Sequence, residues 1–321
     1  MEKKTVVGID IGGTKCAVIL AKADNEFIDI IEKTKLKTDK TQPALEVIAE
    51  FCKVIDKFSE KEKIDAIGIS CGGPLDSKKG IIMRPPNLPM WDDIHIVEIL
   101  EEKYKVPVRL QNDANACALA EWLYGAGKGT ENMIFMTFGT GLGAGLILDG
   151  RLYTGTNDNA GEAGHIRLSE NGPVGYCKIG SFEGFCSGGG IAQLGYILGL
   201  EAYQQGKKAA YYDPEIAPEG INAKTIGDAA EQGDEIALAV YRKCGEYLGK
   251  GLSILIDILN PQRIVLGSIF KRSRDIIWPY AKEVIEKEAL SYSRNVCEVV
   301  PAELDENLGD IAAVTTAMYD K

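Results

Sequence analysis

A glycine-rich turn with one acidic side chain beside it lies near the start of the chain. Gly12 and Gly13 interrupt a run of valine and isoleucine within Thr5–Leu20, which predicts two strands joined by a tight turn. The backbone N–H groups of such a turn can bind a phosphate, and Asp10, at the end of the first strand, can hold a hydrated Mg²⁺ beside it. A P-loop or a dinucleotide fingerprint would lead into a helix instead, and neither glycine spacing is present.

The opening pattern returns in the middle of the chain. Gly8–Leu20 and Met136–Leu148 align without gaps at a constant offset of 128 residues. An internal duplication explains this most simply, and it implies two domains of related topology, each with one glycine turn. We expect the two turns to face each other across a cleft and to hold successive phosphates of one nucleotide.

Asp113 lies between a predicted strand, 106–111, and a predicted helix, 114–124. Side chains at the carboxyl ends of strands commonly form the sites of α/β proteins. One interpretation is a helix N-cap, a role that Asp often fills. The other is a general base that takes a proton from a substrate hydroxyl as phosphate arrives. The residues alone leave both open.

The polar, glycine-rich stretch 150–190 is predicted to be a loop, and it contains one of only two histidines. Glu162, His165 and Glu183 could form a ring of hydrogen-bonding groups for sugar hydroxyls, although a surface histidine often has no such role. A tetrahedral zinc site needs four suitably spaced ligands, and this stretch does not supply them. We therefore interpret Cys177 and Cys186 as small buried residues.

The remaining pattern alternates strands and helices, which predicts an α/β fold. The stretch 201–224 is expected to be a peripheral polar excursion, and Asn260-Pro261 to end a long helix. The expected elements are strands at 27–36, 66–71, 263–267 and 296–300, helices at 44–58, 94–104, 235–259, 274–290 and 308–319, and an extended loop at 85–91.

Composition narrows the class of protein. The chain has 321 residues, 45% hydrophobic and 26% charged, which suits two globular domains. A net charge of −11 argues against nucleic-acid binding, and no run of about 18 apolar residues predicts a membrane span. The N-terminus shows no secretory signal, and the eight cysteines are scattered without a framework, so we expect a reduced, cytoplasmic protein.

Seven motifs in one order then resemble the ROK family of bacterial sugar kinases and sugar-responsive repressors. The resemblance implies the actin-like ATPase fold, two duplicated ribonuclease H-like α/β domains flanking a nucleotide and sugar cleft. It places the first domain at 1–118 and the second at 119–307, with helix 308–321 packing back on the first. The motifs are DIGGTK (10–15), CGGPLD (71–76), NLPMW (87–91), NDANA (112–116), FGTGLGAG (138–145), GEAGH (161–165) and LNPQRIVLG (259–267).

The resemblance also assigns roles. Asp10 would lie near Mg²⁺ and the phosphates, and Asp113 would be the catalytic base for the 6-hydroxyl of a hexose. The two phosphate loops would be Gly12, Gly13, Thr14, Lys15 and Gly139, Thr140, Gly141. The sugar would be bound by Gly73, Asn87, Asn112, Asp113, Glu162, His165 and Glu183, and the adenosine would be bordered by Gly188, Gly189 and Gly267.

One motif departs from the family. Typical members have CxCGxxGCxE after the histidine, and that histidine and three cysteines bind structural zinc. Here the stretch reads GYCKIGSFE, one residue shorter, with Gly175, Lys178 and Ser181 in place of expected residues. The sequence thus predicts no structural zinc, and His165 must be oriented by ordinary hydrogen bonds.

The resulting hypothesis is an ATP-dependent hexose 6-kinase, most like a glucokinase and paired as a homodimer. Fructose, mannose, allose or an N-acetylated amino sugar are alternative substrates. A second class is a non-catalytic, sugar-responsive regulator; such repressors carry a winged helix before the DIGGTK-like strand, and only a few residues precede it here. A third is a structural actin-like ATPase, which would have no use for Asn112, Glu162 and His165.

Overall fold

A computed structural model describes residues 3–304 and 307–320 of the chain. The chain forms two compact units, each built from separate stretches. Unit 1 comprises Met1–Phe135, Gly145–Ala160 and Glu303–Lys321, and unit 2 comprises Met136–Ala144 and Gly161–Ala302. The predicted domain boundary between 118 and 119 stays a prediction.

The first five-stranded sheet has the order β3-β2-β1-β4-β7. β1 pairs antiparallel with β2 and parallel with β4, and β4 pairs parallel with β7. The central strands are apolar and buried, whereas the edge strand β3 alternates exposed residues, most of them charged, with partly buried ones, as expected of an edge. The bounds are β1 Lys4–Ile11, β2 Lys15–Ala23, β3 Ile28–Lys37, β4 Ala66–Cys71 and β7 Val108–Asn112.

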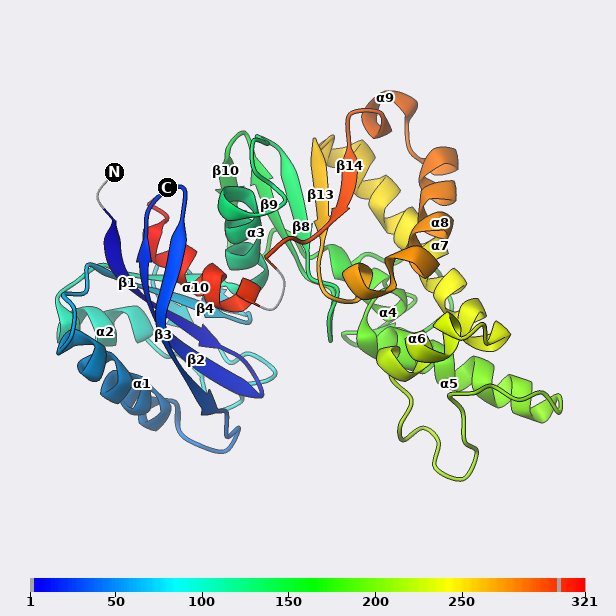
Figure 1. Cartoon of the computed structure of the whole chain (residues 1–321), viewed down its shortest axis with the longest axis horizontal. Coiled ribbons are helices and arrows are strands. Elements are labelled where there is room, and N and C mark those ends of the chain that lie inside the picture. Colours follow the sequence, from blue (N-terminus) through cyan, green and yellow to red (C-terminus); the bar gives the residue numbers. More distant parts are fainter. Residues whose placement is uncertain (1–2, 305–306, 321) are drawn as a thin grey trace. The chain divides into compact units, whose positions relative to one another are not determined.

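Helices cover both faces of this sheet (Figure 1). On one face, α1 (Ala44–Ser59) and α2 (Ile96–Tyr104) bury apolar side chains against alternate residues of β1. On the other, α10 (Leu308–Met318) packs so closely that a Cβ on Gly68 would lie 2.2 Å from the backbone nitrogen of Ala317. Because no larger side chain fits there, this glycine allows α10 to reach the sheet.

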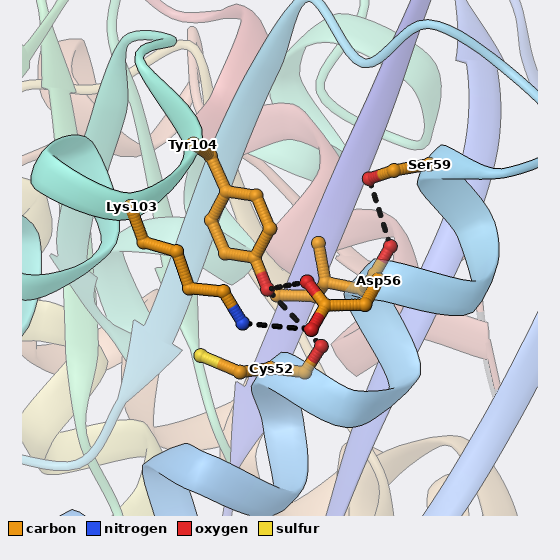
Figure 2. A network of polar contacts seen from close by, with 6 residues as sticks. Cys52, Asp56, Ser59, Lys103 and Tyr104 are labelled. Carbon is orange, nitrogen blue, oxygen red and sulfur yellow. Dashed lines mark hydrogen bonds and ion pairs between the residues drawn. The ribbon is translucent and has the colours of Figure 1, made fainter.

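A polar network joins α1 to the end of α2 (Figure 2). Tyr104 donates from its hydroxyl to Oδ1 of Asp56 (2.9 Å), and Lys103 Nζ donates to Oδ2 of the same carboxylate (2.8 Å). The hydrogen bond from Lys103 is the main reason that the pKa of Asp56 is lowered. The network ties the two helices of this face at their solvent-exposed edge.

The second five-stranded sheet repeats the connectivity of the first. Its order is β10-β9-β8-β13-β14. If the five strands of each sheet are numbered in chain order, both sheets have the order third-second-first-fourth-fifth. This confirms the predicted α/β fold with duplicated topology. The bounds are β8 Met133–Met136, β9 Ala144–Leu148, β10 Arg151–Tyr153, β13 Arg263–Leu266 and β14 Glu298–Pro301.

Among the described residues, the other elements include two short hairpins, seven further α-helices and the 3₁₀-helix η1. The long helix α7 packs along α8, and Asn260 ends α7 in the left-handed conformation, as predicted. The bounds are β5 Leu75–Asp76, β6 Ile81–Ile82, β11 Val174–Gly175, β12 Lys178–Ile179, η1 Ala163–His165, α3 Asp113–Tyr124, α4 Phe182–Phe185, α5 Gly188–Gln204, α6 Ala223–Glu231, α7 Glu235–Leu259, α8 Ile269–Glu288 and α9 Ser291–Arg294.

Most of the long periodic elements were predicted correctly, but the helices α5 and α6 were not predicted, and two irregular regions differ from the expectation. The stretch 150–190 is not a plain loop, because it contains β10, η1, β11, β12, α4 and the start of α5. The second glycine loop spans 137–143, whereas the first spans only 12–14, so the gapless alignment does not give two equal turns. Within the described residues, no helix is long and apolar enough to cross a membrane.

Candidate active site

The first glycine turn is closed by backbone bonds. The N–H of Gly12 donates to the carbonyl of Lys15 (3.1 Å), and the N–H of Thr38 donates to the carbonyl of Thr14 (3.2 Å). The hydroxyl of Thr38 also donates to the carbonyl of Gly12 (2.7 Å). The side chains of Thr14 and Lys15 remain exposed, so this predicted phosphate loop is rigid in its backbone and open at its surface.

Asp10 lies at the end of β1 among other acidic groups. Burial, followed by the charges of Asp310 and Asp113, raises the pKa of Asp10 to about 6, although Lys33 and Lys15 act in the opposite direction. Asp310 is 4% exposed and forms an ion pair with Lys33. A partly buried carboxylate that carries uncompensated repulsion fits a hydrated divalent cation, because the cation would relieve that repulsion.

The sequence reasoning missed Asp310 and Lys33. Asp310 lies in the first turn of α10, in an otherwise apolar stretch, and a lone carboxylate in such a stretch was the signal available. Nothing local linked it to Asp10, which is 300 residues away in the sequence. Only the packing of α10 on the first sheet brings the two acidic residues together.

Asp113 is the first residue of α3, and the helix is capped by its neighbour. Asn112 is the N-cap, and its Oδ1 accepts from the N–H of Ala114 (3.0 Å). The capping interpretation of Asp113 is therefore wrong, although its Oδ1 also accepts from that N–H (2.8 Å). The Asp113 side chain is reached by solvent, yet surrounding protein displaces enough water that desolvation raises its pKa.

Three further predicted residues of unit 1 lie beside Asp113 and the first turn. A Cβ built on Gly13 would lie 2.6 Å from the Cβ of Asn87, and one on Gly73 would lie 3.2 Å from Nδ2 of Asn112. A Cβ on Gly72 would lie 3.8 Å from Oδ2 of Asp113. The structure thus brings the first glycine turn next to Asn87, and the loop at 72–73 next to Asn112 and Asp113.

In unit 2, the predicted nucleotide-binding glycines also meet. The N–H of Gly188, at the start of α5, donates to the carbonyl of Gly139 (2.7 Å), and a Cβ on Gly189 would lie 3.9 Å from the carbonyl oxygen of Thr140. Gly267, after β13, donates to the carbonyl of Met136 (3.0 Å). The second glycine loop therefore lies against the N-terminus of a helix, a favourable place for an anion.

The three predicted sugar ligands of unit 2 come from one folded stretch. Glu162 is the N-cap of the short helix η1 and His165 is its last residue, and both are exposed. Glu183 lies in α4, which packs on η1, and its Oε2 accepts from the N–H of Leu142 (3.0 Å). The structure therefore places Glu183 beside η1 and against the second glycine loop, a contact that sequence reasoning did not foresee.

Ordinary contacts hold the His165 backbone and ring. Lys178 Nζ donates to the His165 carbonyl (2.7 Å), and the Tyr176 ring meets the imidazole edge-on, with centroids 6.3 Å apart. Lys178 and Tyr176 both belong to the β11–β12 hairpin, in the stretch where typical members have the zinc motif. The hydrogen bond reaches the backbone carbonyl and the ring contact is aromatic, so the orientation of the imidazole by hydrogen bonds stays a prediction.

The expectation for the two cysteines of this stretch is half correct. Cys186 is buried, and its thiol lies 3.5 Å from the carbonyl of Cys244. Cys177 is exposed, because it forms the two-residue turn of the β11–β12 hairpin with Tyr176, and both residues have positive φ. Among the described residues, no group of three or more His, Cys, Asp or Glu side chains is arranged to hold a metal ion.

Comparison with known proteins places the chain in a family. The family model described as "ROK family" matches residues 6–318. A glucokinase of Halalkalibacterium halodurans is 32% identical, over 97% of this chain and 94% of that protein. The DNA-binding transcriptional dual regulator NagC of Escherichia coli is also 32% identical, over 98% of this chain and 76% of the regulator.

Solved structures agree. A ROK family glucokinase from Streptomyces griseus, determined in complex with glucose and AMPPNP, is 27% identical and superimposes with a TM-score of 0.78, over 98% of this chain and 99% of that one. The family match over nearly the whole chain and the shared architecture lead to one assignment. This chain is a member of the ROK family and has the actin-like ATPase fold.

Proposed function

We propose that this protein is an ATP-dependent sugar kinase that phosphorylates the 6-hydroxyl of a hexose, with glucose as the first candidate. Its similarity to glucokinases supports this substrate. The single observation that carries the proposal is Asp113, a solvent-accessible carboxylate with a raised pKa at the carboxyl end of β7. A site that only binds sugar does not need such a base.

The residues of unit 1 would perform the proton transfer. Asn87 and Asn112 would hydrogen-bond the sugar hydroxyls, and Gly73 would let the loop approach the sugar. Asp113 would then accept the proton of the 6-hydroxyl as the γ-phosphate is transferred. A raised pKa suits this role, because a base is most effective when its pKa approaches the working pH.

The first glycine turn would hold phosphates. Its backbone N–H groups and the exposed Lys15 ammonium would bind phosphate oxygens, and Asp10 would hold a magnesium ion through water. When bound, the ion would neutralise charge on the phosphates. Since little covalent chemistry is required of a kinase, positioning and charge neutralisation supply most of its rate.

The residues of unit 2 would bind the rest of the two substrates. Gly139, Thr140 and Gly141 would form the second phosphate loop against the N-terminus of α5, and Gly188, Gly189 and Gly267 would border the adenosine. Glu162, His165 and Glu183 would accept and donate hydrogen bonds to sugar hydroxyls. On the same family grounds we propose domains at 1–118 and 119–307, a homodimer, and a cytoplasmic location.

A second candidate function follows from the similarity to NagC. A sugar-responsive regulator would bind the sugar without turning over ATP. The two candidates therefore differ in one measurable property, ADP formation in the presence of a sugar. Mannose, fructose, allose and N-acetylated amino sugars remain alternative substrates for the kinase.

The proposal is tested by ADP release with Mg²⁺, ATP and a panel of these sugars. We expect at least one hexose to stimulate ADP formation well above the sugar-free rate. Sugar binding by calorimetry with no stimulation by any sugar would favour the regulator and reject the kinase.

The base assignment is tested on the best substrate with the Asp113→Asn variant. We expect kcat to fall about 10²–10⁴-fold, the usual contribution of a general base, while substrate affinity stays within about threefold. Asp29→Asn, the same change at an exposed position of β3, is the matched control and should leave kcat unchanged. A near-normal kcat in Asp113→Asn would show that another group takes the proton.

A further inference from the structure

Glu183 contacts two segments with different proposed ligands: the second glycine loop, which would bind phosphate, and η1, which would bind sugar. Its Oε2 accepts a hydrogen bond from the N–H of Leu142, in the loop that would bind phosphate. A Cβ built on Gly141 would lie only 2.8 Å from the same oxygen, so the loop passes directly against the carboxylate. This contact is charge-assisted, which makes it stronger than a bond between neutral groups.

Glu183 also packs against η1, whose Glu162 and His165 would bind the sugar. Gly164, inside η1 between Glu162 and His165, would place a Cβ 3.4 Å from the Cβ of Glu183 and 2.1 Å from the carbonyl oxygen of Leu142. The N–H of Phe182, the residue before Glu183, donates to the carbonyl of Ile166, directly after η1 (2.8 Å). Glu183 is thus packed between η1 and the second glycine loop.

The backbone around Glu183 fixes its place. Ser181 is fully buried and caps α4, with its Oγ accepting from the N–H of Gly184 (3.1 Å) and donating to the carbonyl of Gly175 (3.3 Å). The bond to Gly175 therefore ties α4 to β11, and a shift of α4 relative to that strand would break it. A change in the orientation of the Glu183 carboxylate would be passed to the loop at 139–142 rather than absorbed by α4.

We propose that Glu183 is a positioning residue that couples sugar binding to the second phosphate loop. This inference rests on the proposed function, and it goes beyond the role of a sugar ligand. Oε2 holds the N–H of Leu142, and Oε1 is the oxygen that would accept a sugar hydroxyl. A sugar that fixes the carboxylate also fixes the loop, so sugar and nucleotide strengthen each other's binding, and linkage makes the effect reciprocal.

The test measures the affinity of the magnesium complex of a non-hydrolysable ATP analogue, with and without sugar. Glu183→Ala is expected to lower the sugar-free affinity about tenfold, since it removes a charge-assisted bond to the loop. Glu183→Gln keeps an acceptor for Leu142 and should stay within about threefold of the wild type. Glu170→Ala, the same change at an exposed position outside the proposed site, is the matched control and should leave the sugar-free affinity unchanged.

The wild-type protein supplies a second readout that does not depend on a variant folding. Adding sugar alone should slow amide hydrogen exchange in residues 138–143, and this effect should be lost in Glu183→Ala. Unchanged exchange in the wild type, or wild-type nucleotide affinity in Glu183→Ala, would overturn the coupling. If either of these results is found and the wild type still phosphorylates sugar, the coupling is rejected and the proposed function stands. If the wild type binds no nucleotide, the proposed function is rejected as well.

Discussion

The two glycine loops of this protein occupy equivalent places in two sheets of the same connectivity, yet they are stabilised differently. The first is a turn of three residues between strands of eight and nine residues, and backbone bonds close it. The second spans seven residues between strands of four and five residues; backbone bonds from Thr137 to Gly143 and from Gly139 to Gly141 also close it, and the side chains of Thr137 and Glu183 add further bonds. A duplication can therefore preserve topology while one copy of a loop becomes longer and gains side-chain support, here from Thr137 and Glu183.

The carboxylates beside the two loops differ in the same way. Asp10 is surrounded by Asp310 and Asp113, and its pKa is raised to about 6. Glu183 already accepts a backbone N–H. The carboxylate of Asp10 beside the first loop thus carries charge repulsion that a cation would relieve. The carboxylate of Glu183 beside the second loop already holds that loop through a hydrogen bond.

Replacing Asp10, the carboxylate beside the first loop, should have the largest effect on activity. Asp10→Asn is expected to lower kcat about 10²-fold or more, because the magnesium ion would lose its protein partner. Nucleotide binding measured without magnesium should change by less than about threefold. Wild-type activity in this variant would remove Asp10 from the phosphate site.

The same variant should be more stable than the wild type at neutral pH. A carboxyl whose folded pKa is raised binds more protons folded than unfolded between about pH 4 and pH 6, so the unfolding free energy of the wild type falls as pH rises through that window. Asn has no charge to desolvate, so Asp10→Asn should gain about 1–2 kcal/mol at pH 7.5 and nothing at pH 3.5. Urea unfolding at both pH values measures this, and equal stability at pH 7.5 would contradict the raised pKa.

A matched pair of threonine variants should show an intermediate effect. The N–H of Gly143 donates to the Thr137 hydroxyl (2.8 Å), so Thr137→Val is expected to weaken nucleotide binding about three- to fivefold. Thr38→Val removes a hydroxyl that donates to the carbonyl of Gly12, so no N–H of the first turn loses its acceptor, and the affinity should change less than twofold. Equal effects of the two variants would show that the loops do not differ in how they are held.

The smallest expected effect concerns the hairpin in the stretch of the family zinc motif. Lys178→Met removes the bond to the His165 carbonyl, and the KM for sugar should rise about two- to threefold while kcat and the KM for ATP stay constant. Lys224→Met, at an exposed position of α6, serves as the control. A fall in kcat without a change in the KM for sugar would argue against this orienting role.

The sequence was sufficient for features that depend on neighbours along the chain. Long periodic helices such as α1 and α7 were predicted nearly to the residue, and Asp113 was placed correctly between a strand and a helix. Features that depend on distant contacts were missed. Asp310 reaches Asp10 only through packing of α10, and the Glu183 contact with Leu142 joins α4 to the second glycine loop, 41 residues apart in the sequence.

Some errors came from judging residue types without their backbone. Cysteines are usually buried, which favoured a buried Cys177, yet this residue forms an exposed hairpin turn with positive φ. The glycines of 150–190 suggested a loop, but Gly188, Gly189 and Gly190 begin a helix because Ser187 caps it. Side-chain caps and turn conformation decided both cases, and hydrophobic periodicity does not report them.

The position of the new phosphate on the sugar tests the central claim most directly. Wild-type protein, Mg²⁺, ATP and glucose are incubated, and the product is identified by two-dimensional phosphorus–proton NMR. The account predicts that the product phosphorus couples to the two protons on carbon 6, because Asp113 is proposed to deprotonate that hydroxyl. A phosphate on any other carbon, or release of inorganic phosphate alone, would contradict it.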